Sequence, residues 1–212
     1  MTLEVRLTPE IALHFGTPVY VGLVEDHANL NRALTRLIRE WRNAGSGVAA
    51  SNVGGWQSPA TLLERAEQEI GRLNQIIQRT IEQLAQVPGM VVGRRTPEPA
   101  SSYRAHGWAN INRDGDYNHF HVHPGSHWAV VYYVDIGELA PDVPYNGRLE
   151  LRDPRPAAVH GRVKGFAFGQ SLAIDPQSGM VVGFPAWLEH GVHPFRGRGE
   201  RISIAVNVDM TA

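Results

Sequence analysis

The spacing of apolar residues divides the chain into a helical first part and a β-rich second part. Between residues 30 and 41, and again between 62 and 84, apolar side chains recur at three- and four-residue steps. Apolar residues at these steps form one stripe along a helix. The pattern therefore predicts two amphipathic helices within residues 1–90.

The expected ends of these helices follow from capping residues. The stretch 43–46 (NAGS) ends the first helix, and residues 51–58 form a glycine-containing loop. Ser58 followed by Pro59 predicts the start of the second helix, because serine caps helices and proline suits the first turn. The second helix is expected to end near Gln86, before Pro88 and Gly89.

Residues 91–212 alternate short β-rich runs with turns of Gly, Pro, Asp and Asn. Runs at this spacing indicate a sandwich or barrel. The simplest architecture is a single domain, residues 1–212, whose helices bury their stripes against the outside of a β-sandwich. The runs are at 102–112, 127–136, 147–151, 171–174, 179–184 and 201–208, with shorter candidates at 3–7, 17–23 and 90–93.

Composition narrows the chemistry and the partners. The 212 residues carry a formal net charge of −1, so no overall field attracts nucleic acid or an anionic membrane. The chain has no cysteine, which leaves imidazole and carboxylate as metal ligands. No apolar run approaches membrane-spanning length and no leader pattern opens the chain, so a cytoplasmic protein is expected. Exposed apolar stripes on the helices would fit a homodimer.

Four of the ten histidines lie between positions 119 and 127, and residues 119–123 read His-Phe-His-Val-His. On a strand all three imidazoles of 119–123 would point the same way. Two imidazoles two residues apart can chelate one metal, and His190, which follows the strand predicted at 180–184, is the best candidate for a third ligand. Imidazoles without thiolates favour Zn, Fe, Cu or Ni over Mg or Ca.

Arg201 lies eleven residues after His190, at the start of a predicted strand on which Ser203 shares its face. A guanidinium can bind a carboxylate through two parallel hydrogen bonds, and a neighbouring hydroxyl can add a third. A strand–turn–strand would bring Arg201 beside His190. The sequence thus predicts a metal with a carboxylate anchor nearby. The simpler alternative is a structural ion pair of Arg201 with Glu200 or another surface acid.

These segments resemble the iron- and 2-oxoglutarate-dependent oxygenases of the double-stranded β-helix (jelly-roll) fold, within a bacterial and phage group. The resemblance rests on residues 179–208 and 121–134, with further matching pieces at 15–20, 51–58, 108–110 and 153–155. Its most specific element is the spacing from His190 to Arg201 and Ser203. The resemblance implies a mainly β fold, a jelly roll flanked by the two helices, with an Fe(II)- and 2-oxoglutarate-dependent dioxygenase activity.

The resemblance also implies roles for individual residues. His121 and His123 correspond to the proximal ligand pair and His190 to the distal ligand of the iron. Arg201 and Ser203 correspond to the pair that binds the far carboxylate of 2-oxoglutarate.

Three further residues are weaker candidates for contacts near this cosubstrate: Asn110, Tyr132 and Tyr133. The expected reaction is hydroxylation of a substrate that the sequence does not identify, with release of succinate and CO2.

One position departs from the wider superfamily, which mostly has a carboxylate where this chain has His123. Two alternatives therefore stay open: a cupin-like three-histidine metalloenzyme that does not use 2-oxoglutarate, and a non-catalytic metal-binding β-sandwich. His119 is a possible replacement for one of the proximal pair.

Overall fold

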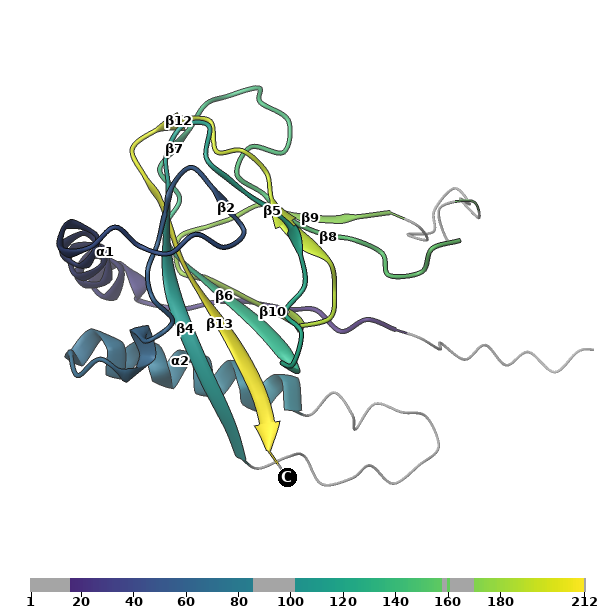
Figure 1. Cartoon of the computed structure of the whole chain (residues 1–212), viewed down its shortest axis with the longest axis horizontal. Coiled ribbons are helices and arrows are strands. Elements are labelled where there is room, and N and C mark those ends of the chain that lie inside the picture. Colours follow the sequence, from purple (N-terminus) through teal and green to yellow (C-terminus); the bar gives the residue numbers. More distant parts are fainter. Residues whose placement is uncertain (1–15, 86–101, 158–159, 161–169, 212) are drawn as a thin grey trace, which may run out of the picture.

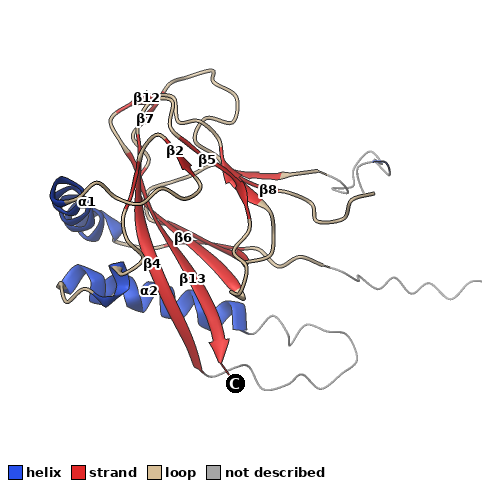
Figure 2. Ribbon diagram, viewed as in Figure 1, coloured by secondary structure: helices blue, strands red, loops and turns tan. Residues whose placement is uncertain are grey.

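The computed structural model describes residues 16–85, 102–157, 160 and 170–211, and two α-helices and two main sheets dominate it (Figures 1 and 2). The helices are α1 (His27–Ala44) and α2 (Gln68–Ala85), with a short 3-10 helix η1 (Leu62–Glu64). The strands are β1 (Tyr20–Leu23), β2 (Asn52–Val53), β3 (Trp56–Gln57), β4 (Ser102–Asn112), β5 (Tyr117–His121), β6 (Trp128–Asp135), β7 (Glu138–Leu139), β8 (Leu149–Leu151), β9 (Leu172–Ile174), β10 (Met180–Pro185), β11 (His190–Val192), β12 (Gly197–Arg198) and β13 (Arg201–Thr211).

The strands form a large sheet and a small sheet. The large sheet has the order β1-β10-β6-β13-β4-β3 and the small sheet the order β2-β5-β11-β8-β9, while β12 and β7 form a separate pair. The named strands pair antiparallel, and consecutive strands such as β5 and β6 belong to different sheets. Two such sheets that exchange successive strands are typical of a jelly roll.

Both helices cover the outer face of the large sheet (Figure 1). Their stripes pack on alternate residues of the long central strand β13, and burial of each such side chain contributes about 1.5–3 kcal/mol. Because these stripes are buried, they no longer support a dimer. The packed residues include Leu34, Ile38, Ile70, Leu73, Ile202 and Ile204, all 0% exposed.

A buried amide anchors α1 to the large sheet. Asn31 donates a hydrogen bond to the backbone oxygen of Val134 (2.8 Å) and accepts one from the hydroxyl of Tyr132 (2.6 Å). The register between β13 and β6 shifts here, because Ile202 pairs with Asp135 and Ser203 with Tyr133. This bulge leaves Val134 without a partner on β13, so its carbonyl is free to accept from the helix.

The predicted start of the second helix at Ser58 was wrong, because α2 begins at Gln68. The Ser58 hydroxyl accepts a hydrogen bond from the backbone N–H of Ala109 (3.0 Å) and donates to the carbonyl of Pro59 (2.8 Å). It therefore ties its segment to β4 and does not cap a helix.

The loop predicted at residues 51–58 contains two short strands. β2 pairs with β5 of the small sheet and β3 with β4 of the large sheet, so this segment connects both. Gly54 (φ 65°) and Gly55 (φ 62°) make the turn between them in the left-handed region. The strand candidates at 3–7 and 90–93 lie outside the described residues. Neither described helix combines the length and apolarity needed to cross a membrane.

Candidate metal centre

Three histidines from the small sheet come together. His121 ends β5 and His190 begins β11, and the two residues are direct partners across this strand pair. The ring centroids lie 4.4 Å apart for His121 and His190, 4.9 Å for His121 and His123, and 5.0 Å for His123 and His190. One potential ligand atom from each ring lies within 4.8 Å of the others, so one ion could bind to all three.

Backbone contacts orient these rings. His121 Nδ1 lies 2.6 Å from the carbonyl oxygen of His119, and His190 Nδ1 lies 2.8 Å from that of Leu188. A carbonyl accepts only from a protonated nitrogen, so this geometry assigns the proton to Nδ1 and leaves Nε2 free for a metal. The backbone N–H of His123 donates to the carbonyl of Ala186 (2.9 Å), which holds the third ring beside the segment that leads to His190.

The pocket keeps the three imidazoles neutral. Burial lowers the pKa of His190 to about 3 and that of His123 to about 4, and it also lowers the pKa of His121. Mutual repulsion between the rings adds to the effect at His123 and His190. Three neutral imidazoles and no thiolate fit a divalent transition metal.

These pKa values predict that metal binding depends little on pH near neutrality. Ligands that are already deprotonated release no protons to the metal, so the Kd for Co(II) should change less than about threefold between about pH 6 and pH 8. Ordinary histidines, with a pKa of 6.5, would instead lose affinity steeply toward pH 6. Isothermal titration at both values checks this, and a loss of more than about tenfold would contradict the neutral triad.

His119 does not join the cluster. Between the pairs His190–His121 and Val192–Asn118, two steps along β11 face three steps along β5. The extra residue is a β-bulge, which breaks the strict alternation of side chains. The ring of His119 instead makes an edge contact with that of Tyr117, with centroids 5.1 Å apart. His119 is therefore outside the group of three converging ligand atoms, although it lines a surface hollow together with His121 and His123.

The inner face of the large sheet brings the predicted anion-binding residues together. Ser203 pairs with Asn110 on β4 and with Tyr133 on β6, so the three lie side by side across the sheet. Arg201 lies two residues before Ser203 and donates a hydrogen bond from Nη1 to its hydroxyl (3.3 Å). Its guanidinium carbon lies 5.2 Å from the centre of the Tyr133 ring.

Arg201 is 1% exposed, yet most of its donors are unused. Its Nε and Nη2 have no hydrogen-bond partner among the described residues, and the same holds for the Tyr133 hydroxyl and Asn110 Oδ1. Burial lowers the pKa of Arg201, and the Tyr133 hydroxyl opposes this shift. Glu200, the acid considered as its partner, pairs with Arg39, Arg42 and Arg113 instead. A buried guanidinium without a counter-ion calls for an anionic ligand.

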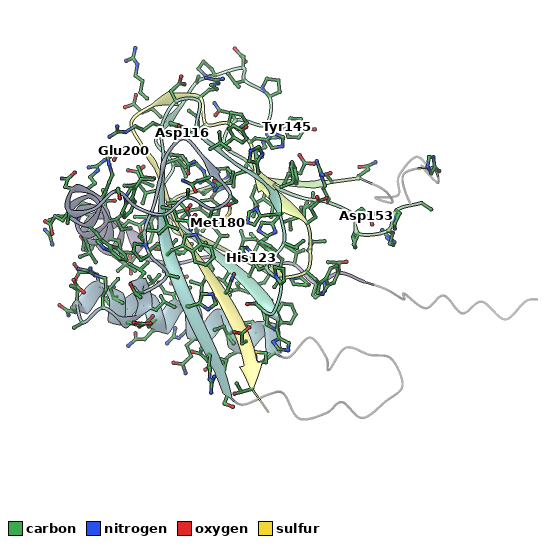
Figure 3. The ribbon with its side chains drawn as sticks, viewed as in Figure 1. Asp116, His123, Tyr145, Asp153, Met180 and Glu200 are labelled. Atoms are coloured by element: carbon green, nitrogen blue, oxygen red, sulfur yellow. The ribbon has the colours of Figure 1, made fainter. Side chains whose placement is uncertain are left out.

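The histidines and the anion-binding residues line one pocket between the two sheets. Its cavity volume is about 50 Å³. His121, His123 and His190 form one wall, and Arg201, Ser203, Asn110 and Tyr133 form another. In Figure 3, His123 lies on the side of the long strands β4 and β13 that faces away from α1.

Tyr132 does not reach this pocket, and its prediction as a cosubstrate contact was wrong. Adjacent residues of a strand face opposite sides, so Tyr132 points from β6 into the core under the helices, where it donates to Asn31.

The sequence interpretation missed two asparagines on β4 and β13 near the pocket. Asn207 lines the same pocket, and Asn112 is the strand partner of Arg201. Both have a buried Oδ1 without a partner among the described residues. Asn112 lies two residues after Asn110 on β4, and Asn207 lies four residues after Ser203 on β13. Because residues at even spacing share one face of a strand, this spacing could have identified both asparagines from the sequence.

Residues 106–207 match a family model described as "Putative 2OG-Fe(II) oxygenase". The matched segment contains the three histidines and Arg201. The chain therefore contains a domain of the 2OG-Fe(II) oxygenase family. It is thus an enzyme of the iron- and 2-oxoglutarate-dependent class, as the sequence resemblance implied, and the non-catalytic alternative is set aside.

Solved oxygenases share the fold. A prolyl-4-hydroxylase from Pseudomonas putida is 16% identical, with a TM-score of 0.59 over 92% of this chain and 93% of that chain. HygX from Streptomyces hygroscopicus, solved with nickel, 2-oxoglutarate and hygromycin B, is 12% identical, with a TM-score of 0.60 over 92% and 84% of the two chains. At these identities the likeness shows the fold, and it confirms the predicted jelly roll. No curated protein matches the sequence.

Proposed function

We propose that His121, His123 and His190 hold the iron of this oxygenase and that Arg201 and Ser203 bind the far carboxylate of 2-oxoglutarate. One observation carries the proposal: a fully buried guanidinium with unused donors lies in the same pocket as three neutral, converging imidazoles. An iron–2-oxoglutarate pair supplies both missing partners, a cation for the imidazoles and an anion for the arginine.

The protein residues orient the cosubstrate and exclude water. Arg201 can donate through two parallel N–H groups, and Ser203, whose oxygen accepts from Arg201, still has its own O–H to donate to the carboxylate. Burial raises the pKa of Tyr133, so its hydroxyl stays protonated and can donate as well. The bound iron, with 2-oxoglutarate and dioxygen, supplies oxidation of a substrate C–H bond with release of succinate and CO2, for which we propose hydroxylation as the outcome.

The decisive test is anaerobic addition of Fe(II) and then 2-oxoglutarate to metal-free protein. The proposal expects a metal-to-ligand charge-transfer band that saturates with 2-oxoglutarate and that succinate, which lacks the keto group, does not produce. Iron binding without such a band would instead favour the three-histidine metalloenzyme that does not use 2-oxoglutarate.

The two neighbouring tyrosines offer a separate prediction. Tyr132→Phe removes the bond to Asn31 and should lower the free energy of unfolding by about 1–2 kcal/mol, with an unchanged 2-oxoglutarate Kd. Tyr133→Phe removes an unpaired hydroxyl and should leave stability nearly unchanged while raising that Kd by roughly two- to tenfold. Urea unfolding and cosubstrate titration measure both effects, and equal weakening by both variants would contradict the assignment.

We further propose that the helical and β-rich parts act as one domain of a cytoplasmic enzyme, without a nucleic-acid or membrane partner. The shared core of helices and large sheet supports the first point. The net charge of −1 supports the absence of nucleic acid and anionic membranes as partners, and Glu200 neutralises part of the charge of Arg39, Arg42 and Arg113 around it.

A further inference from the structure

Strand β13 begins at Arg201 with little support from its own backbone. Pairing with β6 starts only at Ile202, so Arg201 pairs with Asn112 of β4 alone. Two glycines with positive φ, Gly197 (153°) and Gly199 (80°), precede it. Such residues lose more conformational freedom on ordering than any others. Arg201, the residue proposed to bind the cosubstrate, is thus the first residue of a strand whose start is held on one side only. Its position depends on further contacts.

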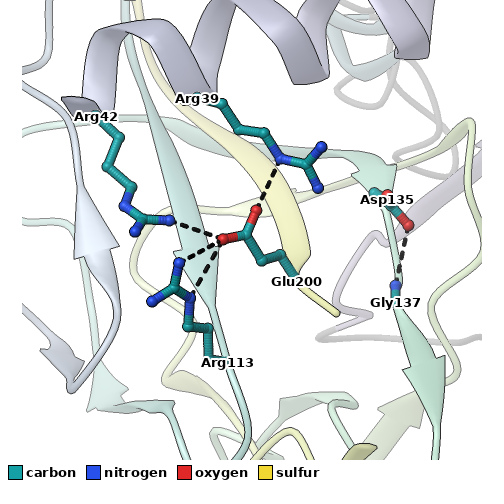
Figure 4. Close-up of polar contacts among 6 residues, drawn as sticks. All are labelled: Arg39, Arg42, Arg113, Asp135, Gly137 and Glu200. Atoms are coloured by element: carbon teal, nitrogen blue, oxygen red, sulfur yellow. Dashed lines mark hydrogen bonds and ion pairs between the residues drawn. The ribbon is translucent and has the colours of Figure 1, made fainter. Parts of the chain in front are cut away.

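Glu200, the residue before Arg201, supplies contacts to two other elements (Figure 4). Its Oε2 accepts from Arg39 Nε (2.9 Å), and its Oε1 accepts from Arg42 Nη1 (2.7 Å) and Arg113 Nη2 (2.9 Å). Arg39 and Arg42 belong to α1, and Arg113 directly follows β4. We call these four residues the Glu200 clamp.

The Glu200 clamp is more than an ordinary surface ion pair. An exposed pair contributes about 0–1 kcal/mol, but here three guanidiniums share one carboxylate whose side chain is only 11% exposed. Burial alone would raise the pKa of Glu200, yet the hydrogen bonds from Arg113 and Arg39 outweigh it and hold the pKa below its usual range. The carboxylate is therefore ionised at neutral pH.

We propose that Glu200 is a positioning residue for Arg201, which fixes the start of β13 so that the guanidinium meets the cosubstrate carboxylate. This inference rests on the proposed function. Glu200 does not line the pocket and lies at the α1 side of the molecule, so it acts only through Arg201 (Figure 3). Bidentate binding of a carboxylate depends on the fixed planar geometry of the two N–H groups. In catalysis, a misplacement of about 1 Å can lower the rate by about 100-fold, and we expect cosubstrate binding to be sensitive to displacement as well.

The test compares Glu200→Gln with a matched control, Glu189→Gln. Glu189 precedes His190 as Glu200 precedes Arg201, but it makes a single half-exposed pair with Arg152 (3.0 Å). Anaerobic titration of 2-oxoglutarate into Fe(II)-loaded protein should give a Kd about tenfold higher for Glu200→Gln and within about twofold of wild type for Glu189→Gln. The Fe(II) affinity of Glu200→Gln should be unchanged, because the histidines belong to the other sheet.

A second variant keeps the inference testable if Glu200→Gln does not fold. The double variant Arg39→Gln, Arg42→Gln removes the contacts to α1 and keeps Arg113, and we expect about a threefold rise in the 2-oxoglutarate Kd. If these variants lower the urea midpoint but leave the 2-oxoglutarate Kd unchanged, Glu200 has a merely structural role. That result would overturn this inference and leave the proposed function intact. If wild-type protein binds iron but no 2-oxoglutarate, the proposed function fails and the inference with it.

Discussion

Replacing His190 with alanine is expected to abolish iron binding and all turnover. His190 is 5% exposed and lies opposite His121 in the strand pair, so no other described side chain is positioned to replace it. Loss of a group that merely supports a ligand costs about 10–100-fold in metal affinity, and loss of a ligand should cost more than about 100-fold. Anaerobic Fe(II) titration of untagged protein measures the change.

The matched control for this variant is His119→Ala. It removes an imidazole of the same histidine-rich segment that is not one of the three converging ligands. Iron affinity within about threefold of wild type is expected, because this ring contributes no ligand. Equal loss of iron in both variants, or retention of iron by His190→Ala, would contradict the assigned triad.

The bulge shows where the sequence stops predicting the site. The alternation of a strand placed His119, His121 and His123 on one face, and the sequence interpretation chose His121 and His123 but kept His119 as a possible replacement. The choice depends on how β5 pairs with β11, which is some 70 residues away in the chain. His190 itself was predictable, because a strand and a turn lead directly to it.

The same limit explains the errors in the helical part. The periodicity of apolar residues predicted both helices, because an apolar stripe depends only on the spacing of residues close together in the sequence. It could not show that the Ser58 hydroxyl bonds to Ala109 in β4, a contact over 51 residues, and so it placed the helix start too early. Likewise, alternation separates Tyr132 from Tyr133 but does not say which side the helices cover.

Arg201 was predicted as a carboxylate anchor from its spacing to His190. That its guanidinium is buried with unused donors follows only from the three-dimensional structure. In the sequence, Glu200 was its nearest partner; in the fold, Glu200 binds three other arginines and Arg201 points to the opposite side with unused donors. A buried charge without a counter-ion among the described residues destabilises the free protein, so its presence is best explained by a ligand.

Replacing Arg201 with leucine should therefore separate cosubstrate binding from stability. Losing one partner of a buried, hydrogen-bonded charge pair costs about 2–5 kcal/mol, so the 2-oxoglutarate Kd should rise by about 100-fold or more, with Fe(II) affinity unchanged. Lysine keeps the charge but not the planar pair of donors, and Arg201→Lys should lie between wild type and Arg201→Leu. The charge-transfer band and isothermal titration report the Kd values.

The stability of Arg201→Leu distinguishes a ligand-binding arginine from a structural one. Because leucine removes an uncompensated buried charge from the ligand-free protein, the urea midpoint of Arg201→Leu should equal or exceed that of wild type. A structural arginine would give the reverse, a lower midpoint with cosubstrate binding intact. Wild-type affinity for 2-oxoglutarate in Arg201→Leu would remove the carboxylate anchor from this pocket and leave a three-histidine metal site that binds its cosubstrate by other means.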